Sequence, residues 1–136
     1  MVTAAPETAV AEGTGAGLFQ VAIAAGTHGF VMDEPAEAGG LDTGPNPFDL
    51  LRAALAGCTL ITMRLYAQRK GWPVDGIRVQ VTYHKGESGQ RDRFERILEL
   101  GDVTEEQREG LLRIAQRCPV HLLLESGADT PVTLAA

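Results

Sequence analysis

The sequence predicts an α+β domain in which antiparallel strands cover one side of two helices. Three observations lead to this fold class. A long apolar pattern with clear start and stop signals fills residues 47–70, and short patterns typical of strands stand before and after it. A capping-box pattern at residues 104–107 begins a second helix. With 136 residues, the chain is expected to form a single domain over 1–136 with a core of its own.

Composition and charge exclude several classes of partner. The formal net charge is −6 and no basic face stands out, which argues against nucleic acid and anionic membranes. The first 16 residues lack the basic and apolar regions of a signal peptide, and residues 50–66 are too short and too interrupted to span a bilayer comfortably. We therefore expect a cytoplasmic protein without a membrane partner. In that compartment a disulfide is more often transient and catalytic than structural.

The N-terminal third of the chain predicts a flexible arm followed by a hairpin. Residues 1–16 are rich in alanine, glycine and threonine, as is typical of an arm that enters a strand only near its end. Residues 18–24 and 28–33 read as two strands, with Ala25-Gly26-Thr27 as the turn between them. A loop over 34–45, punctuated by proline and glycine, then leads to the long helix.

The long helix has well-defined ends. Asn46 is a good N-cap and Pro47 occupies the first helical position, where its missing N–H costs nothing. Asp49 is the third helical residue, so its carboxylate can reach back to the backbone of the cap. Gly71, followed by Trp72-Pro73, ends the helix.

Cys58 is predicted to point toward the packed side of this helix. At about 100° per residue, six mostly apolar residues lie within about 60° of it: Leu51, Ala54, Leu55, Ile61, Thr62 and Leu65. The simplest interpretation is a small buried hydrophobe. Cys58 also lies about three turns from the helix start, so a cation from another element or chain would have to lower its pKa.

The C-terminal half predicts a second hairpin, a second helix and a closing strand. Residues 77–84 and 93–100 read as strands joined by a polar connector. Thr104 and Gln107 begin a helix that carries Cys118 on its apolar face and ends before Pro119. Residues 120–124 continue as an irregular or helical piece, and residues 131–135 read as a strand. If the two predicted helices pack together, the cysteines can reach disulfide distance, with Cα atoms within about 7 Å.

Several motifs follow one another in a specific order along the chain: Asp33-Glu34-Pro35, Gly39-Gly40, Gly44-Pro45-Asn46-Pro47, the helical segment 49–59 and Arg117-Cys118-Pro119-Val120. Together with the Cys58 and Cys118 pair, they resemble the OsmC/Ohr family of organic hydroperoxide reductases. The resemblance covers nearly the whole chain and is greatest to the OsmC-like branch.

The resemblance implies an intertwined homodimer, with antiparallel sheets wrapped around two central helices and active sites at the dimer interface. It also implies an oxidative stress response enzyme in which Cys58 attacks an organic hydroperoxide and becomes a sulfenic acid. Cys118 would then form a disulfide with Cys58, and an external small or lipoyl-type dithiol would reduce it without a bound cofactor or metal. Asp49 stands near the acid of the family and is the third candidate catalytic residue.

Two departures from the family pattern leave alternatives open. The family uses an arginine on an N-terminal strand to hold the cysteine as a thiolate, whereas here no arginine precedes Arg52. Phe48 also stands where the family has a glutamate. Arg64, Arg91 and His84 are the candidate replacement cations.

These departures motivate two other interpretations. One is an OsmC-like protein without peroxidase activity that binds a small hydrophobic ligand at the dimer interface. The other is a metal site, suggested by the Cys118-Pro119-Val120-His121 spacing and formed by Cys58, Cys118, His121 and His84.

Overall fold

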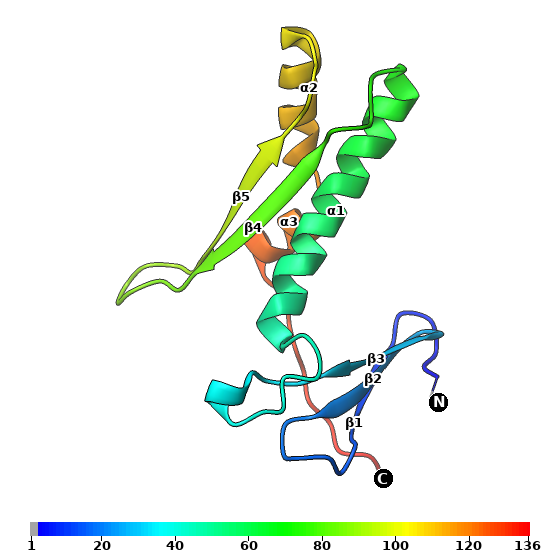
Figure 1. Ribbon diagram of the computed structural model, residues 1–136, viewed down its shortest axis with the longest axis vertical. Helices are drawn as coiled ribbons and strands as arrows, with labels where there is room; N and C mark the ends of the chain where they lie inside the picture. Colours follow the sequence, from blue (N-terminus) through cyan, green and yellow to red (C-terminus); the bar gives the residue numbers. More distant parts are fainter. Residues whose placement is uncertain (1–2) are drawn as a thin grey trace. The chain divides into compact units, whose positions relative to one another are not determined.

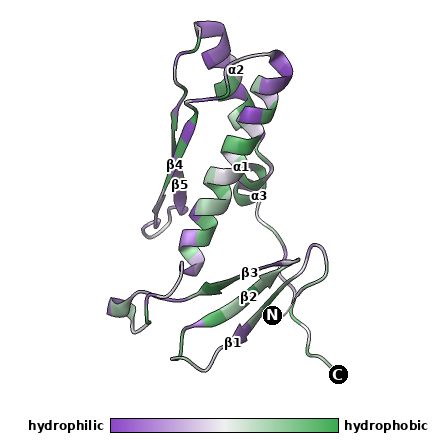
Figure 2. Cartoon of the chain, turned by 45° about the vertical axis from the view of Figure 1, so that its right-hand side comes forward, coloured by the Kyte–Doolittle hydropathy of each residue, from purple (hydrophilic) through white to green (hydrophobic). Residues whose placement is uncertain are grey.

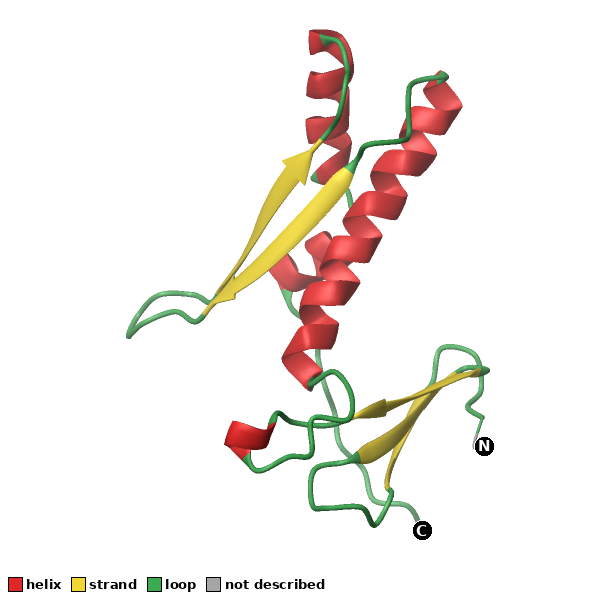
Figure 3. Cartoon of the chain, viewed as in Figure 1, coloured by secondary structure: helices red, strands yellow, loops and turns green. Residues whose placement is uncertain are grey.

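The computed structural model describes residues 3–136 of the chain. These residues belong to two compact units, Met1–Leu51 and Arg52–Ala136. Helices, a short 3-10 turn (η1, Ala36–Ala38) and antiparallel strands alternate along the chain (Figures 1 and 3). The predicted α+β class is therefore confirmed.

The first unit contains a three-stranded antiparallel sheet in the order β1-β2-β3, formed by Ala9–Gly13, Val21–Ala25 and His28–Met32. Ala25 pairs with His28, and Gly26 has the positive φ of 59° that a two-residue hairpin turn requires. The predicted hairpin is confirmed. β1 lies near the end of the predicted N-terminal arm, residues 1–16, where the sequence indicated entry into a strand, and it pairs with β2 along its whole length. The flexibility of the arm stays a prediction, and residues 1 and 2 lie outside the described part.

A buried carboxylate organises the loop that follows β3. Asp33 is 1% exposed and accepts hydrogen bonds from the hydroxyl of Thr43 at 2.6 Å and from the backbone N–H groups of Glu34, Leu41 and Thr43. The Thr43 hydroxyl, helped by these N–H groups and opposed by burial, holds the pKa of Asp33 below its usual value. A Cβ on Gly40 would overlap the Glu34 carbonyl, so the loop can close this tightly only with glycine there.

Helix α1 spans Pro47–Lys70, as predicted. Its first turn is a reciprocal cap, because Asn46 Oδ1 accepts from the Asp49 N–H at 2.7 Å and Asp49 Oδ2 accepts from the Asn46 N–H at 2.9 Å. Gly71, with a φ of 72°, ends the helix in the left-handed conformation.

The second unit packs the rest of α1 with the β4–β5 hairpin (Arg78–His84 and Arg93–Glu99) and α2 (Glu105–Ala115). Figures 1 and 2 show α1 running alongside this hairpin. The hydropathy colours of Figure 2 show apolar and polar residues interspersed along α1. The predicted capping box of Thr104 and Gln107 is present at the start of α2. Six buried residues form the core: Met63, Ala67, Ile77, Leu100, Leu111 and Ala115.

The packed face of α1 differs from the predicted one. Its buried residues are Leu55, Thr59, Met63 and Ala67, a stripe with a spacing of four. Of the residues predicted to pack around Cys58, Leu55 is buried, whereas Ile61 and Leu65 are exposed, with 67% and 45% of their surface accessible. The apolar pattern covers more of the helix than one core can contact, so the pattern by itself did not locate the stripe.

Two predictions for the C-terminal region also need correction. The second helix ends at Ala115, and a separate helix α3, Pro119–Ser126, begins directly after Cys118. Residues 127–136 form neither helix nor strand, so the closing strand predicted at 131–135 is wrong for the single chain. A strand needs a neighbouring edge to pair with, and Val132 and Leu134 are instead 89% and 95% exposed.

Candidate functional site

The two cysteines, 60 residues apart in the sequence (118 minus 58), are neighbours in the second unit. Both are free thiols, and their side chains share a hydrogen bond. Cys58 lies half-buried on α1, whereas Cys118 is completely buried. A small molecule can therefore approach Cys58, and Cys118 lies behind it within reach of its sulfur.

Cys118 is placed at the positive end of a helix. It is the N-cap of α3, with Pro119 as the first helical residue. The N–H groups of His121 and Val120 face its sulfur, although without the geometry of a full capping hydrogen bond. These dipoles stabilise negative charge at Cys118.

The surroundings separate the acidities of the two thiols. Burial and the hydrogen bond with Cys118 raise the pKa of Cys58, against the smaller effects of the Val120 N–H and the Thr62 hydroxyl. Burial works to raise the pKa of Cys118 as well, but the hydrogen bond from Cys58, the N–H groups of α3 and the Thr59 hydroxyl outweigh it and lower that pKa. The pair therefore loses its first proton from the Cys118 side.

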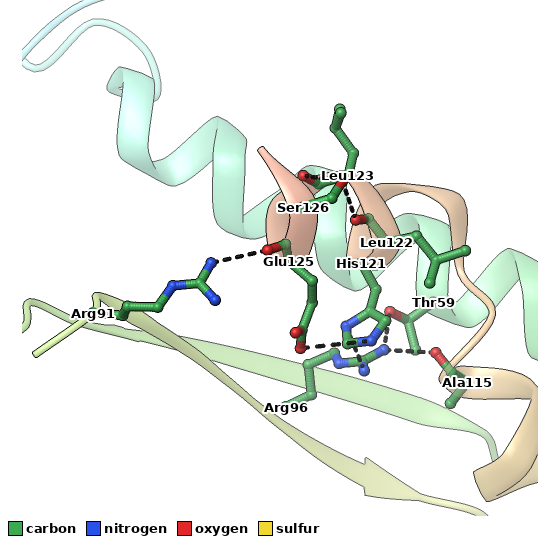
Figure 4. Close-up of polar contacts among 9 residues, drawn as sticks. All are labelled: Thr59, Arg91, Arg96, Ala115, His121, Leu122, Leu123, Glu125 and Ser126. Carbon is green, nitrogen blue, oxygen red and sulfur yellow. Dashed lines mark hydrogen bonds and ion pairs between the residues drawn. The ribbon is translucent and has the colours of Figure 1, made fainter. Parts of the chain in front are cut away.

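Arg96, on β5, contacts Thr59, Ala115 and His121 (Figure 4). Its Nη1 donates to Thr59 Oγ1 of α1 at 3.1 Å and to the Ala115 carbonyl at the end of α2 at 2.9 Å. Its Nη2 lies 3.0 Å from Nδ1 of His121 in α3. One guanidinium thus links β5 to three helices.

Sequence reasoning missed Arg96, although a signal for it existed. Along β5, Phe94, Arg96 and Leu98 are the partly buried residues, and the residues between them are exposed. Arg96 therefore occupies an inward position of an alternating strand. An inward arginine is unusual because a buried charge needs partners.

His121 is held as a neutral imidazole. Burial, followed by the charge of Arg96, lowers its pKa, and Glu125 raises it less. Arginine only donates hydrogen bonds, so Nδ1 must accept and the ring proton is assigned to Nε2. Nε2 lies 3.8 Å from Glu125 Oε1.

The three predicted cations have other hydrogen-bond partners. Arg64 donates to the Val74 carbonyl at 3.2 Å, and Arg91 donates to the Glu125 carbonyl at 3.0 Å. His84 pairs with Glu95 across the β4–β5 hairpin at 3.2 Å. None of these contacts involves a cysteine.

The described residues give no support to a metal site, and they place Asp49 in the cap of α1. Within residues 3–136, no group of three or more His, Cys, Asp and Glu side chains has the arrangement of a metal site. Asp49 takes part in the reciprocal cap of α1, nine residues before Cys58. Its catalytic role stays a prediction.

A cavity of about 290 Å³ adjoins the polar contacts around His121. Apolar, basic and acidic side chains all contribute to its wall, which is formed by Leu55, Arg91, Asp92, Arg93, Phe94, His121, Leu124 and Glu125. Leu55 lies one turn before Cys58 on α1. The cavity can hold a small organic molecule with an apolar body.

Comparison with known proteins identifies the fold. The family model described as OsmC-like protein matches residues 39–133. No curated protein matches the chain.

Solved structures agree with the family model. The organic hydroperoxide resistance protein OhrB of Bacillus subtilis has a TM-score of 0.59 and 26% identity, over 90% of this chain and 92% of its own. An OsmC-like protein from Mycoplasma pneumoniae has a TM-score of 0.64 and 21% identity, over 87% and 84%. A Psychrobacter arcticus 273-4 protein named for an osmotic stress induced and detoxification response has a TM-score of 0.71 and 18% identity, over 88% of each chain.

Proposed function

Because the chain belongs to the OsmC-like protein family, we propose that it is a cysteine-based peroxidase that reduces organic hydroperoxides to alcohols. The observation that carries the proposal is the hydrogen-bonded pair of free thiols, one half-buried and one fully buried. The similarity to OhrB, which is named for organic hydroperoxide resistance, supports the same chemistry.

In the proposed reaction, the Cys58 thiolate attacks the distal oxygen of the hydroperoxide. The O–O bond breaks, the alkoxide leaves and takes up a proton to give the alcohol, and Cys58 becomes a sulfenic acid. The Cys118 thiolate then attacks the Cys58 sulfur, the S–O bond breaks, and hydroxide leaves and takes up a proton from solvent to become water. The resulting Cys58–Cys118 disulfide is reduced by exchange with an external small or lipoyl-type dithiol.

The site supports these roles through differences in access. Cys58 is the sulfur that a hydroperoxide can approach, and the fully buried Cys118 is protected from it. The cavity between Leu55, Phe94 and Leu124 offers apolar contacts to the organic part of the substrate.

We also propose that the protein is a cytoplasmic homodimer. By length and composition α1 is apolar enough to cross a membrane, yet the same is true of core helices in soluble proteins, and 22% of its most apolar window is buried within one chain. A second copy would cover the exposed apolar residues Ile61 and Leu65. The reducing cytoplasm would keep both thiols ready for turnover.

The test is the intact mass of the reduced protein before and after one equivalent of cumene hydroperoxide, with free thiols counted. We expect a loss of about two mass units and of both thiols, as one disulfide forms. Cys58→Ser should abolish turnover. If both thiols survive a modest excess of the hydroperoxide, the peroxidase proposal is wrong.

That second outcome would favour an OsmC-like protein that binds a small hydrophobic ligand without reducing it. The raised pKa of Cys58 and the lack of an arginine before Arg52 are the observations that favour this candidate. In that case the thiols should show ordinary reactivity near neutral pH.

A further inference from the structure

Arg96 has no role in the reaction steps proposed above. It is a cation on the inward side of β5, and it makes three contacts at 2.9–3.1 Å with α1, α2 and α3, the elements around the thiol pair. None of the contacts is with a sulfur. Its connection to the cysteines runs through Thr59.

Thr59 connects the guanidinium to the buried sulfur. It is fully buried, and its Oγ1 accepts a hydrogen bond from Arg96 Nη1. The hydroxyl proton is then free to point to Cys118, with which the Thr59 side chain also hydrogen-bonds. A hydroxyl that accepts from a cation is polarised and becomes a stronger donor to an anion.

We propose that Arg96 is a positioning residue that acts through the Thr59 hydroxyl to keep Cys118 as the thiolate of the reduced cysteine pair. The N–H groups at the start of α3 support the same charge. In the proposed state the Cys58 thiol donates its hydrogen bond to the Cys118 thiolate.

Other charged groups around the pair do not replace Arg96. His121 is neutral because burial and Arg96 lower its pKa, and Glu125 is negative and interacts with the far side of its ring. Arg117, the residue before Cys118, is exposed to solvent. Arg96 is thus the fixed positive charge among the groups contacting Thr59 and His121 in the described residues.

One consequence of the proposed role of Arg96 depends on the proposed peroxidase reaction. When a hydroperoxide reaches Cys58, the Cys118 thiolate accepts the Cys58 proton, and Cys58 becomes the attacking thiolate. The O–O bond then breaks, and Cys118 returns that proton to the leaving alkoxide, which yields the alcohol. Cys118 is again a thiolate and can attack the sulfenic acid, so the pair needs no external base.

The experiment follows the ultraviolet absorbance of thiolate against pH in the full chain without any hydroperoxide. In a Cys58→Ser background Cys118 is the only thiol, and its titration midpoint is measured with and without Thr59→Val. Removal of one charge-assisted hydrogen bond should raise the midpoint by about one pH unit. Arg96→Gln should raise it by at least as much, and Arg96→Lys should recover part of the shift.

Arg78→Gln is the matched control, because Arg78 is an exposed arginine on the same hairpin, paired with Glu99. It should leave the midpoint unchanged. Thr59→Val keeps the shape of the side chain and keeps Arg96, so it tests the proposal even if Arg96→Gln does not fold. An unchanged Cys118 midpoint in folded Thr59→Val protein would overturn the inference.

The titration separates this inference from the proposed function, because it requires no peroxide. A shifted midpoint in a protein that fails to reduce hydroperoxides would support the role of Arg96 and reject the peroxidase. If turnover is present, the acid limb of kcat/KM against pH should move to higher pH in Thr59→Val protein with both cysteines.

Discussion

The guanidinium of Arg96 lies 3.0 Å from Nδ1 of His121. This contact fixes the histidine as a hydrogen-bond acceptor on that side, because arginine has only donors. It also opposes protonation of the ring, since a second positive charge would face the first. The structure therefore couples the state of a histidine on α3 to an arginine on β5, beside two thiols.

Burial of His121, together with this contact, makes stability depend on pH. The folded pKa of His121 lies below the unfolded value of 6.5, so the unfolded chain binds more protons in that range. The stability contribution of neutral His121 is complete above pH 6.5 and is lost as pH falls through the folded pKa. We expect the free energy of unfolding, measured with urea, to fall below pH 6.5, and to fall less steeply in His121→Gln. Parallel pH curves for the two proteins would contradict this.

Replacing Cys118 should trap the first intermediate. In Cys118→Ser, Cys58 can still be oxidised but has no partner thiol, so a sulfenic acid should accumulate and react with dimedone. Mass spectrometry of the labelled peptide locates the adduct. The oxidation rate should also fall in this variant, because serine cannot serve as the base that the thiolate provides. Cys58→Ser is the control and should give no adduct.

Asp33→Asn should loosen the loop between β3 and α1. An amide in place of the carboxylate loses the negative charge and one acceptor oxygen toward the N–H groups of Leu41 and Thr43. Hydrogen exchange of those two amides should become faster than in the parent protein. Asp42→Asn is the matched control, because Asp42 is exposed and asparagine tolerates its positive φ of 55°.

Low pH should loosen the loop between β3 and α1 in the parent protein, as Asp33→Asn should. The pKa of Asp33 is lowered from 3.8, so its contribution to stability is complete above pH 3.8 and is lost as pH falls through the folded pKa. Exchange of the Leu41 and Thr43 amides, corrected for the intrinsic rate, should increase in that range. Protection that is independent of pH there would contradict the role of Asp33.

The two residues of the α1 cap, Asn46 and Asp49, can be replaced one at a time. Asp49→Ala and Asn46→Ala each remove one half of the reciprocal cap and should each lower the free energy of unfolding by about 1 kcal/mol. Chemical denaturation measures the loss. Peroxide turnover then separates the two roles of Asp49: a catalytic role predicts a loss of turnover in the Asp49 variant that exceeds the loss in the Asn46 variant.

The proposed dimer makes α1 sensitive to charge on its exposed face. Ile61→Asp, or Leu65→Asp, should convert a dimer to a monomer in light scattering, because a carboxylate would be buried unpaired against the second copy. Arg113→Glu, on the exposed side of α2, is the control for an added negative charge. A wild-type protein that is monomeric at high micromolar concentration would reject the dimer.

Local sequence signals predicted the elements that depend on neighbours in the chain. Asn46, Asp49 and Gly71 placed both ends of α1, and Thr104 with Gln107 placed the start of α2, because these residues satisfy backbone groups within a few positions of themselves. The family motifs are local in the same way. Gly40 and Asp33, for instance, both stabilise the tight loop between β3 and α1.

Tertiary structure decided which face of α1 is buried and what surrounds the thiols. The apolar face around Cys58 was broad, and only the packing of β4, β5 and α2 selected the stripe through Thr59 and Met63. Arg96 was hidden for a related reason, since its partners are 37, 19 and 25 residues away in the sequence. The sequence determined that two cysteines, a capped helix and two hairpins exist. Hydrogen bonds and burial between distant segments determined which thiol has its pKa lowered, because electrostatics depends on distances in space.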